Sequence, residues 1–394
     1  MLNHKYKASD LITMIGLLAI IYGFGIATLV VPDKEFSEDE NRYLQQKPEF
    51  SIQSLVDGKY TAEVADYFSD QIPLRDLFVG TKAVIEIAML KSENNDVLLG
   101  SDGYIIAKQD YPSYDDCDKN LKAVNRFADA LANSDETLDL QLDVAIAGRP
   151  QDVLVRYVPA LYPADEYAER DFNHAASILA TSSIDILTPL GAHADAGEYV
   201  YYKTDHHWTS LGAYYAYVEL MTSWGLTPYP LDYFTRETVS EDFYGTTWSK
   251  AGMKWVGPDT IEFFRYPGDD TLITEIVDTG EKLDGLYDRD YLAVKDKYSA
   301  FIGGNNGHVR IYPADGSPLE GERETLVLIK DSFGHSLAPF LAAHFDLEII
   351  DLRYYKLPAI DFVKEVGADR VLILYNMDSL LTTNSLAMLN LGLN

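Results

Sequence analysis

The run DHHW at residues 205–208 places an aspartate beside two imidazoles in a chain with eight histidines. In extended backbone, residues i and i+2 point the same way, so Asp205 can brace His207 and fix its tautomer while His206 points away. Such a histidine suits general-base chemistry. Two histidines and a carboxylate can also hold iron or zinc, but adjacent histidines rarely both reach one ion. We therefore expect no metal.

A helix pattern follows this run, LGAYYAYVELMTSW at residues 211–224. Thr209 or Ser210 can cap that helix, because a hydroxyl at the N-cap accepts a hydrogen bond from a free backbone N–H. The DHHW run would then be only the polar lead-in to the helix. From these residues alone, both interpretations stay open.

Ser332 is the second candidate for chemistry. ETLVLIK at residues 324–330 predicts a buried strand, and DSFGHSLAPFLAAHF begins a helix directly after it. A hydroxyl at the tip of such a turn points out of the carboxyl edge of the sheet, where N–H groups at the helix start can hold an oxyanion. Asp and Ser are also favoured helix caps. The turn is not a G-x-S-x-G elbow, and the order Asp, His, Ser differs from that of the α/β hydrolases.

The elements around these segments predict an α/β domain from residue 97 to residue 394. Short β-like runs alternate with helical patterns, which indicates a largely parallel sheet with helices on both faces. The runs are DVLLG, GYIIA, LDVAIAG, IDILT, TLVLIK, LEIID and RVLILY. Residues from about 228 to 312 are rich in Tyr, Gly and Asp, and we expect them to form a loop-rich insertion.

The N-terminal region predicts a membrane anchor within residues 1–32. Residues 11–31 carry no charge and, at about 1.5 Å per residue, span about 30 Å, the thickness of a hydrocarbon core. Lys5 and Lys7 precede the run and an acidic flank follows it, so the positive-inside rule places residues 33 onward outside the cytoplasm. A cleaved signal peptide is the alternative, but its apolar region is usually shorter and ends in an A-x-A-like site.

Between the anchor and the α/β domain, residues 33–96 predict a linker and two amphipathic helices. Apolar positions recur at helical spacing and are interrupted at Pro73, which predicts helices over Thr61–Ser69 and Arg75–Leu90.

Composition excludes several classes of protein. With 47% apolar and 24% charged residues the 394-residue chain can bury a sizeable core. Its net charge of −30 argues against nucleic-acid binding and against broad adsorption on anionic lipid. The single cysteine, Cys117, excludes an intramolecular disulfide framework and a cysteine-rich zinc site.

Taken together, the segments resemble the DHHW family, which is related to the alginate O-acetyltransferases and to SGNH-hydrolase-like proteins. The resemblance extends from about residue 40 to residue 376. It rests on the blocks ENRYL, FSDQIPLRD, NNDVLLGSDGYI, TDHHWTSLGAYYAY, FYGTTWSKAG, KYSAFIGGNNGHV, IKDSFGHSLAPFL and DLRYY. The chain departs from the SGNH pattern in having KDSFG where many members have a GDS element.

The resemblance implies a three-layer α/β/α domain with a Ser-His-Asp triad. The matching positions are Ser332 as nucleophile, His207 as base and Asp205 as the residue that orients the base. Asn376, after the strand RVLILY, is the oxyanion-hole candidate beside the N–H of Ser332, and loop capping is the equally weighted alternative.

Three further residues are candidates for binding substrate. Arg353 in DLRYY can bind an anionic group or make a packing salt bridge. His206 and Trp208 flank the expected base, and an indole can stack on a sugar.

The expected protein is a membrane-anchored, extracytoplasmic O-acetyltransferase acting on a cell-surface polysaccharide, without a cofactor. Because acetyl-CoA is cytoplasmic, the resemblance also implies a polytopic membrane-bound O-acyltransferase as partner. The alternatives are a carbohydrate O-acetylesterase and a non-catalytic carbohydrate-binding or scaffold protein of the same fold.

Overall fold

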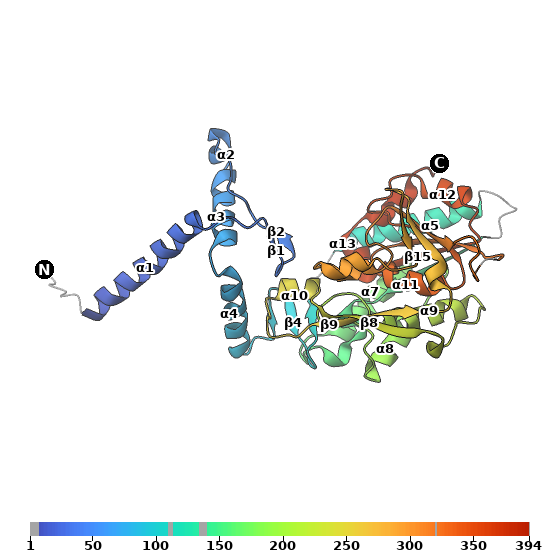
Figure 1. The fold of residues 1–394 in the computed structure, drawn as a ribbon, viewed down its shortest axis with the longest axis horizontal. Helices are drawn as coiled ribbons and strands as arrows, with labels where there is room; N and C mark the ends of the chain where they lie inside the picture. Colours follow the sequence, from blue (N-terminus) through green and yellow to red (C-terminus); the bar gives the residue numbers. More distant parts are fainter. Residues whose placement is uncertain (1–7, 109–112, 134–139, 320, 394) are drawn as a thin grey trace. The chain divides into compact units, whose positions relative to one another are not determined.

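The computed structural model describes residues 8–108, 113–133, 140–319 and 321–393, so Lys5 and Lys7 lie outside the described residues. The chain divides into two units, one of residues 1–95 with 249–254, the other of residues 96–248 with 255–394. Each unit is described by itself below; Figure 1 shows the elements of both.

The smaller unit begins with an apolar helix, α1 (Ala8–Val30). It has 23 residues, and its most apolar 18-residue stretch has a mean hydropathy of 2.1 and is 6% buried, so its length and composition suffice to cross a membrane. The unit's other elements are β1 (Phe36–Ser37), β2 (Arg42–Tyr43), α2 (Ile52–Val56), α3 (Lys59–Gln71), α4 (Arg75–Ala88) and β3 (Glu93–Asn94). Both expected amphipathic helices are present, and the chain between them turns at Pro73 and at Leu74, whose φ is +63°.

The larger unit is built on an eight-stranded sheet in the order β11-β10-β12-β14-β13-β15-β6-β7. The five strands from β14 to β7 pair in parallel, whereas the pairings of β11, β10, β12 and β14 are antiparallel. The strands are β6 (Gln141–Ala147), β7 (Ser183–Ile184), β10 (Leu272–Ile276), β11 (Glu281–Asp284), β12 (His308–Pro313), β13 (Thr325–Lys330), β14 (Asp346–Ile350) and β15 (Arg370–Asn376).

Two smaller antiparallel pairs accompany the sheet, β4 (Val97–Leu99) with β5 (Ile105–Ala107) and β8 (Thr235–Phe243) with β9 (Asp259–Arg265). Residues 228–312 therefore do not form the expected loop-rich insertion. They contribute two strands and most of a third to the antiparallel edge of the main sheet, besides the β8–β9 pair. Polar side chains interrupt the apolar ones in these strands, whose sequences include LITEI, EKLD and HVRIYP. None of them therefore contains the continuous apolar run that indicates a buried strand.

Helices cover both faces of the sheet. The helices of the larger unit are α5 (Asp115–Ala132), α6 (Pro150–Val153), α7 (Ala164–Ile178), α8 (Leu187–Asp195), α9 (Ser210–Ser223), α11 (Gly334–Leu341), α12 (Ala359–Glu365) and α13 (Met377–Thr382). Helix α10 (Thr246–Ala251) has residues in both units, and the described residues also include six short 3₁₀ turns. Figure 1 shows α5, α12 and α13 on one side of β15, and α8 and α9 on the other.

The central strands supply side chains to two separate cores. In β13, Leu326 and Leu328 join the core under α9 and α11, while Val327 and Ile329 join the core under α5 and α12. Successive side chains of a strand point to opposite faces, so a strand covered on both faces must be apolar throughout. This confirms the expected α/β fold with a helical layer on each face.

Because β13, β15 and β6 are parallel neighbours, their carboxyl ends meet at one edge of the sheet. Ser332, Asn376 and Gly148 lie at the ends of these three strands. Ligands of open α/β sheets usually bind beyond the carboxyl ends of the strands, so this edge is where a site is expected.

Candidate active site

Ser332 lies in the short turn between β13 and α11, as the sequence predicts. The carboxylate of the preceding Asp331 fixes this turn, since it accepts hydrogen bonds from the N–H of Phe333 at 3.0 Å and from the N–H of Asn376 at 2.8 Å. Asp331 thus links the turn to the end of β15. Burial raises the pKa of Asp331, and the two N–H groups work against this effect.

His207 reaches Ser332 across 125 positions of sequence. Its Nε2 lies 2.7 Å from the Oγ of Ser332, and its Nδ1 lies 2.6 Å from Oδ1 of Asp205. Asp205 and His207 are both buried, with 3% and 6% of their surfaces exposed. The three side chains form a continuous hydrogen-bonded chain in the order carboxylate, imidazole and hydroxyl. Chemically, this arrangement lets the imidazole accept the serine proton and lets the carboxylate stabilise the resulting imidazolium.

Asp205 is held from two sides. Its Oδ1 also accepts the main-chain N–H of His207 at 3.0 Å, and its Oδ2 accepts the N–H and the hydroxyl of Thr246 at 2.8 and 3.0 Å. Gly245 is required beside it, since a Cβ there would lie 2.2 Å from the Cβ of Asp205. Burial would raise the pKa of Asp205, but the charges of His206 and His207 and the hydrogen bonds outweigh it and hold the pKa below its ordinary value.

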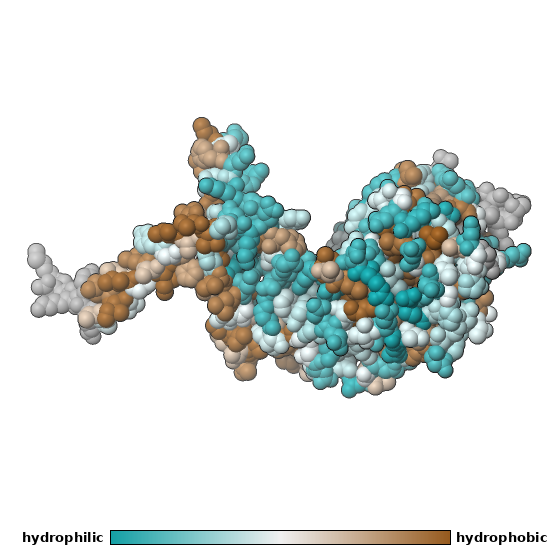
Figure 2. Space-filling model, in the orientation of Figure 1, coloured by the Kyte–Doolittle hydropathy of each residue, from teal (hydrophilic) through white to brown (hydrophobic). Residues whose placement is uncertain are grey.

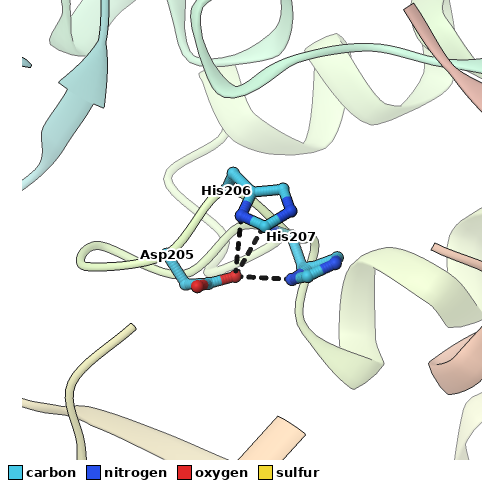
Figure 3. A group of neighbouring side chains, drawn as sticks. All are labelled: Asp205, His206 and His207. Atoms are coloured by element: carbon cyan, nitrogen blue, oxygen red, sulfur yellow. Dashed lines mark hydrogen bonds and ion pairs between the residues drawn. The ribbon is translucent and has the colours of Figure 1, made fainter. Parts of the chain in front are cut away.

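His206 does not point away from His207, contrary to the expectation for an extended path. The chain bends at residues 203–207, and the two imidazole rings lie with centroids 3.8 Å apart. Figure 3 shows the Asp205 carboxylate facing both histidines. The Nδ1 of His206 lies 2.8 Å from the hydroxyl of Thr246, and 42% of its side chain is exposed. His206 is therefore the member of the run that a ligand can still touch.

Possible ligand atoms of Asp205, His206 and His207 lie within 4.8 Å of one another, close enough to raise the question of a metal. Protein partners already occupy these atoms: Nδ1 of His207 is bonded to Asp205, its Nε2 to Ser332, and Nδ1 of His206 to Thr246. A cation bound by all three residues would have to break the Asp205–His207 hydrogen bond. The geometry thus suits proton transfer better than metal coordination.

Trp208 is not placed to bind substrate, and this expectation is corrected. Its side chain is fully buried, and its indole N–H donates to the Oγ of Ser336 at 2.8 Å and to the carbonyl of Phe333 at 3.1 Å. An enclosed ring offers no face to a sugar. Trp208 instead joins the DHHW segment to the first turn of α11. Directly after it, Thr209 caps α9 by accepting the N–H of Gly212 at 3.2 Å, so the capping interpretation holds together with the Asp–His–Ser contact.

Tyr298 belongs to the site although the sequence did not single it out. Its ring stacks on His207 at a centroid distance of 4.0 Å, on a buried side chain. It lies in the block KYSAF and Thr246 lies in FYGTTW, two blocks that carry the family resemblance. The sequence singled out both blocks, but only the fold shows that Tyr298 and Thr246 are the residues in them that contact the DHHW run.

Asn376 caps the start of α13, which was the alternative to a role in the oxyanion hole. Its Oδ1 accepts the N–H of Asp378 at 2.8 Å, and its Nδ2 donates to the carbonyls of Gly148 at 3.0 Å and Ala147 at 3.3 Å. Its amide is thus occupied by main-chain carbonyls. Within the described residues, by contrast, the main-chain N–H groups of Ser332 and Gly148 have no intramolecular acceptor.

Arg353 makes the packing salt bridge that was the alternative to anion binding. Its guanidinium contacts the fully buried Asp351 at 2.5 Å, and Asn305 at 2.9 Å. Asp351 also contacts the buried Lys330 at 3.4 Å. The lysine and the arginine thus share one carboxylate at the ends of β13 and β14, just behind the Ser332 turn.

A parallel-centred sheet between two helical layers, with a serine at its carboxyl edge facing an Asp-x-His segment, defines an SGNH hydrolase-like domain. The family described as "SGNH hydrolase-like domain, acetyltransferase AlgX" matches residues 97–266. The family described as "DHHW protein" matches residues 186–350. The chain is thus similar to both families, in each case over less than half of its length.

Solved structures and curated relatives point to the same families. A DHHW family protein from Eubacterium siraeum is 25% identical with a TM-score of 0.64, covering 77% of this chain and 97% of its own. Bacillus cereus PatB1, solved with a sulfonyl adduct, is 18% identical with a TM-score of 0.59, over 73% of this chain and 98% of its own, and shows the fold alone.

Two curated relatives are named probable alginate O-acetylase AlgJ. The protein from Pseudomonas fluorescens is 22% identical over 162 residues, and that from Pseudomonas syringae pv. tomato is 24% identical over 164 residues. In both cases the match spans 41% of this chain and 41% of the relative.

Proposed function

We propose that this chain is a membrane-anchored, extracytoplasmic O-acetyltransferase that modifies a cell-surface or secreted polysaccharide through Ser332, His207 and Asp205. The observation that carries the proposal is the hydrogen-bonded chain from Asp205 Oδ1 through the His207 ring to Ser332 Oγ, at 2.6 and 2.7 Å. The names of the AlgJ relatives and the description of the AlgX family support acetyl transfer as the chemistry.

The reaction proceeds in two transfers at Ser332. First, Oγ attacks the carbonyl carbon of an acetyl donor while His207 Nε2 takes the hydroxyl proton. The proton then goes to the departing group of the donor, leaving an acetyl ester on Ser332. In the second transfer, His207 takes a proton from a sugar hydroxyl, whose oxygen attacks the ester, and returns the proton to Ser332 Oγ. Asp205 remains ionised throughout, which its lowered pKa favours.

Each transfer passes through a tetrahedral oxyanion that needs donors. We assign the main-chain N–H groups of Ser332 and Gly148 to it, because both lie at the carboxyl edge without an intramolecular acceptor in the described part of the chain. Gly148 is tightly enclosed: a Cβ there would lie 2.6 Å from Leu187 and 2.9 Å from Val153. Fixed donors of this kind stabilise developing charge without reorganisation.

The acetyl donor must be available outside the cytoplasm if α1 is an anchor. A polytopic membrane-bound O-acyltransferase that carries acetyl groups across the bilayer is the partner that meets this requirement. Tethering by α1 would raise the effective concentration of Ser332 near the exit of that partner. Deleting either protein should then abolish acetylation of the polymer.

The test supplies the full chain in detergent with an activated acetyl ester, first alone and then with polysaccharide acceptors. Acetyl transfer to a glycan that is lost in Ser332→Ala supports the proposal. Ester hydrolysis that no acceptor diverts would instead make the protein an O-acetylesterase. Equal turnover by the native chain and Ser332→Ala would leave only a carbohydrate-binding or scaffold role.

A further inference from the structure

Exposed apolar side chains are concentrated in the smaller unit even outside α1. Among the described residues beyond 32, thirteen large apolar side chains are exposed between residues 33 and 95, and seven in all the rest. Scattered exposed apolar residues are normal, but a cluster of this density marks an interaction surface.

Helix α4 carries the most regular part of this cluster. The exposed large apolar residues of α4 and of the two positions that flank it are Leu74, Leu77, Phe78, Val84, Ile85 and Met89. Their spacings of three, four and seven place them on one face of a helix. Figure 2 shows brown, hydrophobic surface along α1 and over α4.

Helix α4 is also fixed by contacts inside the same unit. Ala83 is fully buried, and Lys82 donates to Asn94 and Asn95 at 2.9 and 3.0 Å. The helix therefore cannot rotate to hide the apolar face, which we call the α4 apolar face and define by its six residues above. What covers it must come from outside the unit.

The α4 apolar face is continuous with the surface of α1. The rings of Phe24 in α1 and Phe78 in α4 meet edge to face, with centroids 5.4 Å apart. Phe24 precedes the end of α1 at Val30 by six residues, or about 9 Å of helix rise. Amphipathic helices that lie in a membrane surface bury their apolar face by about 5–10 Å, so the two depths agree.

We infer that α4 lies in the outer surface of the lipid bilayer, with the α4 apolar face among the lipids that surround the end of α1. This inference rests on the membrane anchoring contained in the proposed function. It adds that the chain has two membrane contacts, a spanning helix and an interfacial one. The second contact would hold the residues that follow close to the membrane surface, where an acetyl donor delivered through the bilayer emerges.

Lipid exposure of single positions tests the inference in the full chain reconstituted into vesicles. Val84→Cys and Ile85→Cys, each 53% exposed in the native chain, are labelled with an environment-sensitive fluorophore. Asp76→Cys is the matched control, because Asp76 lies on the same helix but off the α4 apolar face, with 42% of its side chain exposed. The native Cys117 does not interfere, since it is buried and burial raises the pKa of its thiol to about 11.

Brominated lipids should quench the label at residues 84 and 85 by about half and leave residue 76 nearly unchanged, while aqueous iodide should do the reverse. Equal quenching at all three positions would overturn the inference. So would labels at 84 and 85 that neither quencher reaches, because protein and not lipid would then cover the face. Release of the chain by alkaline carbonate would overturn the anchoring itself, and the inference with it, and would leave the chemistry at Ser332 untouched.

Discussion

The ring of Tyr298 lies parallel to the imidazole of His207, with centroids 4.0 Å apart and 12° between the planes. Its hydroxyl lies 3.2 Å from the carbonyl of Ser332 and 3.0 Å from the Oγ of Ser336. One side chain therefore contacts both the proposed base and the turn that carries the proposed nucleophile. Burial raises the pKa of Tyr298 above its ordinary value, so the hydroxyl remains a donor.

Tyr298 should thus act as a positioning residue. Tyr298→Leu removes the stacked ring and should lower kcat about tenfold, equivalent to about 1.4 kcal/mol, with little change in KM for the acetyl ester. Tyr298→Phe keeps the ring and should restore most of the loss. Steady-state kinetics of both variants checks this, with the exposed Tyr354→Phe as control. Equal losses for Leu and Phe would mean that the hydroxyl, and not the stacking, matters.

The proposed triad should fail as a unit. Ser332→Ala, His207→Ala and Asp205→Ala should each lower kcat by about 10⁴-fold or more, and the double variants should be little worse than the single ones. His206→Ala should cost much less, because this residue packs on the His207 ring without holding its proton. A crippling His206→Ala beside a mild His207→Ala would contradict the assignment. Circular dichroism of each variant excludes unfolding as the cause.

Trp208 should matter for stability and not for substrate affinity. Trp208→Phe leaves the carbonyl of Phe333 and the Oγ of Ser336 without their buried donor. The expected cost is about 1–3 kcal/mol in the free energy of unfolding. Urea titration of the full chain in detergent measures this cost, and KM for a glycan acceptor should stay the same. A raised KM with unchanged stability would return Trp208 to the substrate-binding residues.

The sequence was most informative where a local pattern determines structure. Six of the seven β-like runs form strands, whereas only Ile184 of the run IDILT lies in one, because helix α8 begins at Leu187. The Ser332 turn follows its strand as expected, because continuous apolar runs and strand-to-helix turns are local signals. The relation between Asp205 and His207 was also local. Ser332, by contrast, joined them only through the family resemblance, since no local pattern links residues 125 positions apart.

Two errors, and one alternative that the sequence left open, share a different cause. The orientation of His206, the burial of Trp208 and the role of Asn376 all depend on tertiary partners. Thr246 holds the His206 ring beside Asp205, and α11 encloses the Trp208 indole. The carbonyls of residues 147 and 148 accept hydrogen bonds from the Asn376 amide. These partners lie 40 to 229 positions away in sequence, and hydrophobic period and residue propensity contain no information about them.

Removing metal ions should leave the activity unchanged. The ring nitrogens of His207 are bonded to Asp205 and Ser332, so the proposed chemistry needs no cation there. Turnover of the acetyl ester after treatment with EDTA should equal that of the untreated protein. If EDTA abolished turnover and zinc restored it, the Asp205–His206–His207 group would be a metal site and the proton-transfer assignment would be wrong.

Lys330 should make the stability of the fold depend on alkaline pH. It is almost completely buried, and burial lowers its pKa to about 8 although Asp351 opposes the shift. Below pH 8 both the folded and the unfolded chain carry the charge, so folding bears the whole cost of burying it. Between pH 8 and about 10.5 the folded chain loses the proton while the unfolded chain keeps it. The contribution of Lys330 to the free energy of unfolding therefore rises with pH over this range, by up to about 3 kcal/mol. Lys330→Met removes the charge while Arg353 still pairs with Asp351.

The variant should therefore be more stable than the native chain at pH 7, and this advantage should shrink as the pH approaches 10. Other titrating groups, including the buried tyrosines, are common to both chains and cancel in the difference. Urea titrations at pH 7.0 and 9.5 measure that difference directly. An advantage of the same size at both pH values, or one that grows with pH, would show that the pKa of Lys330 is not lowered in the folded chain.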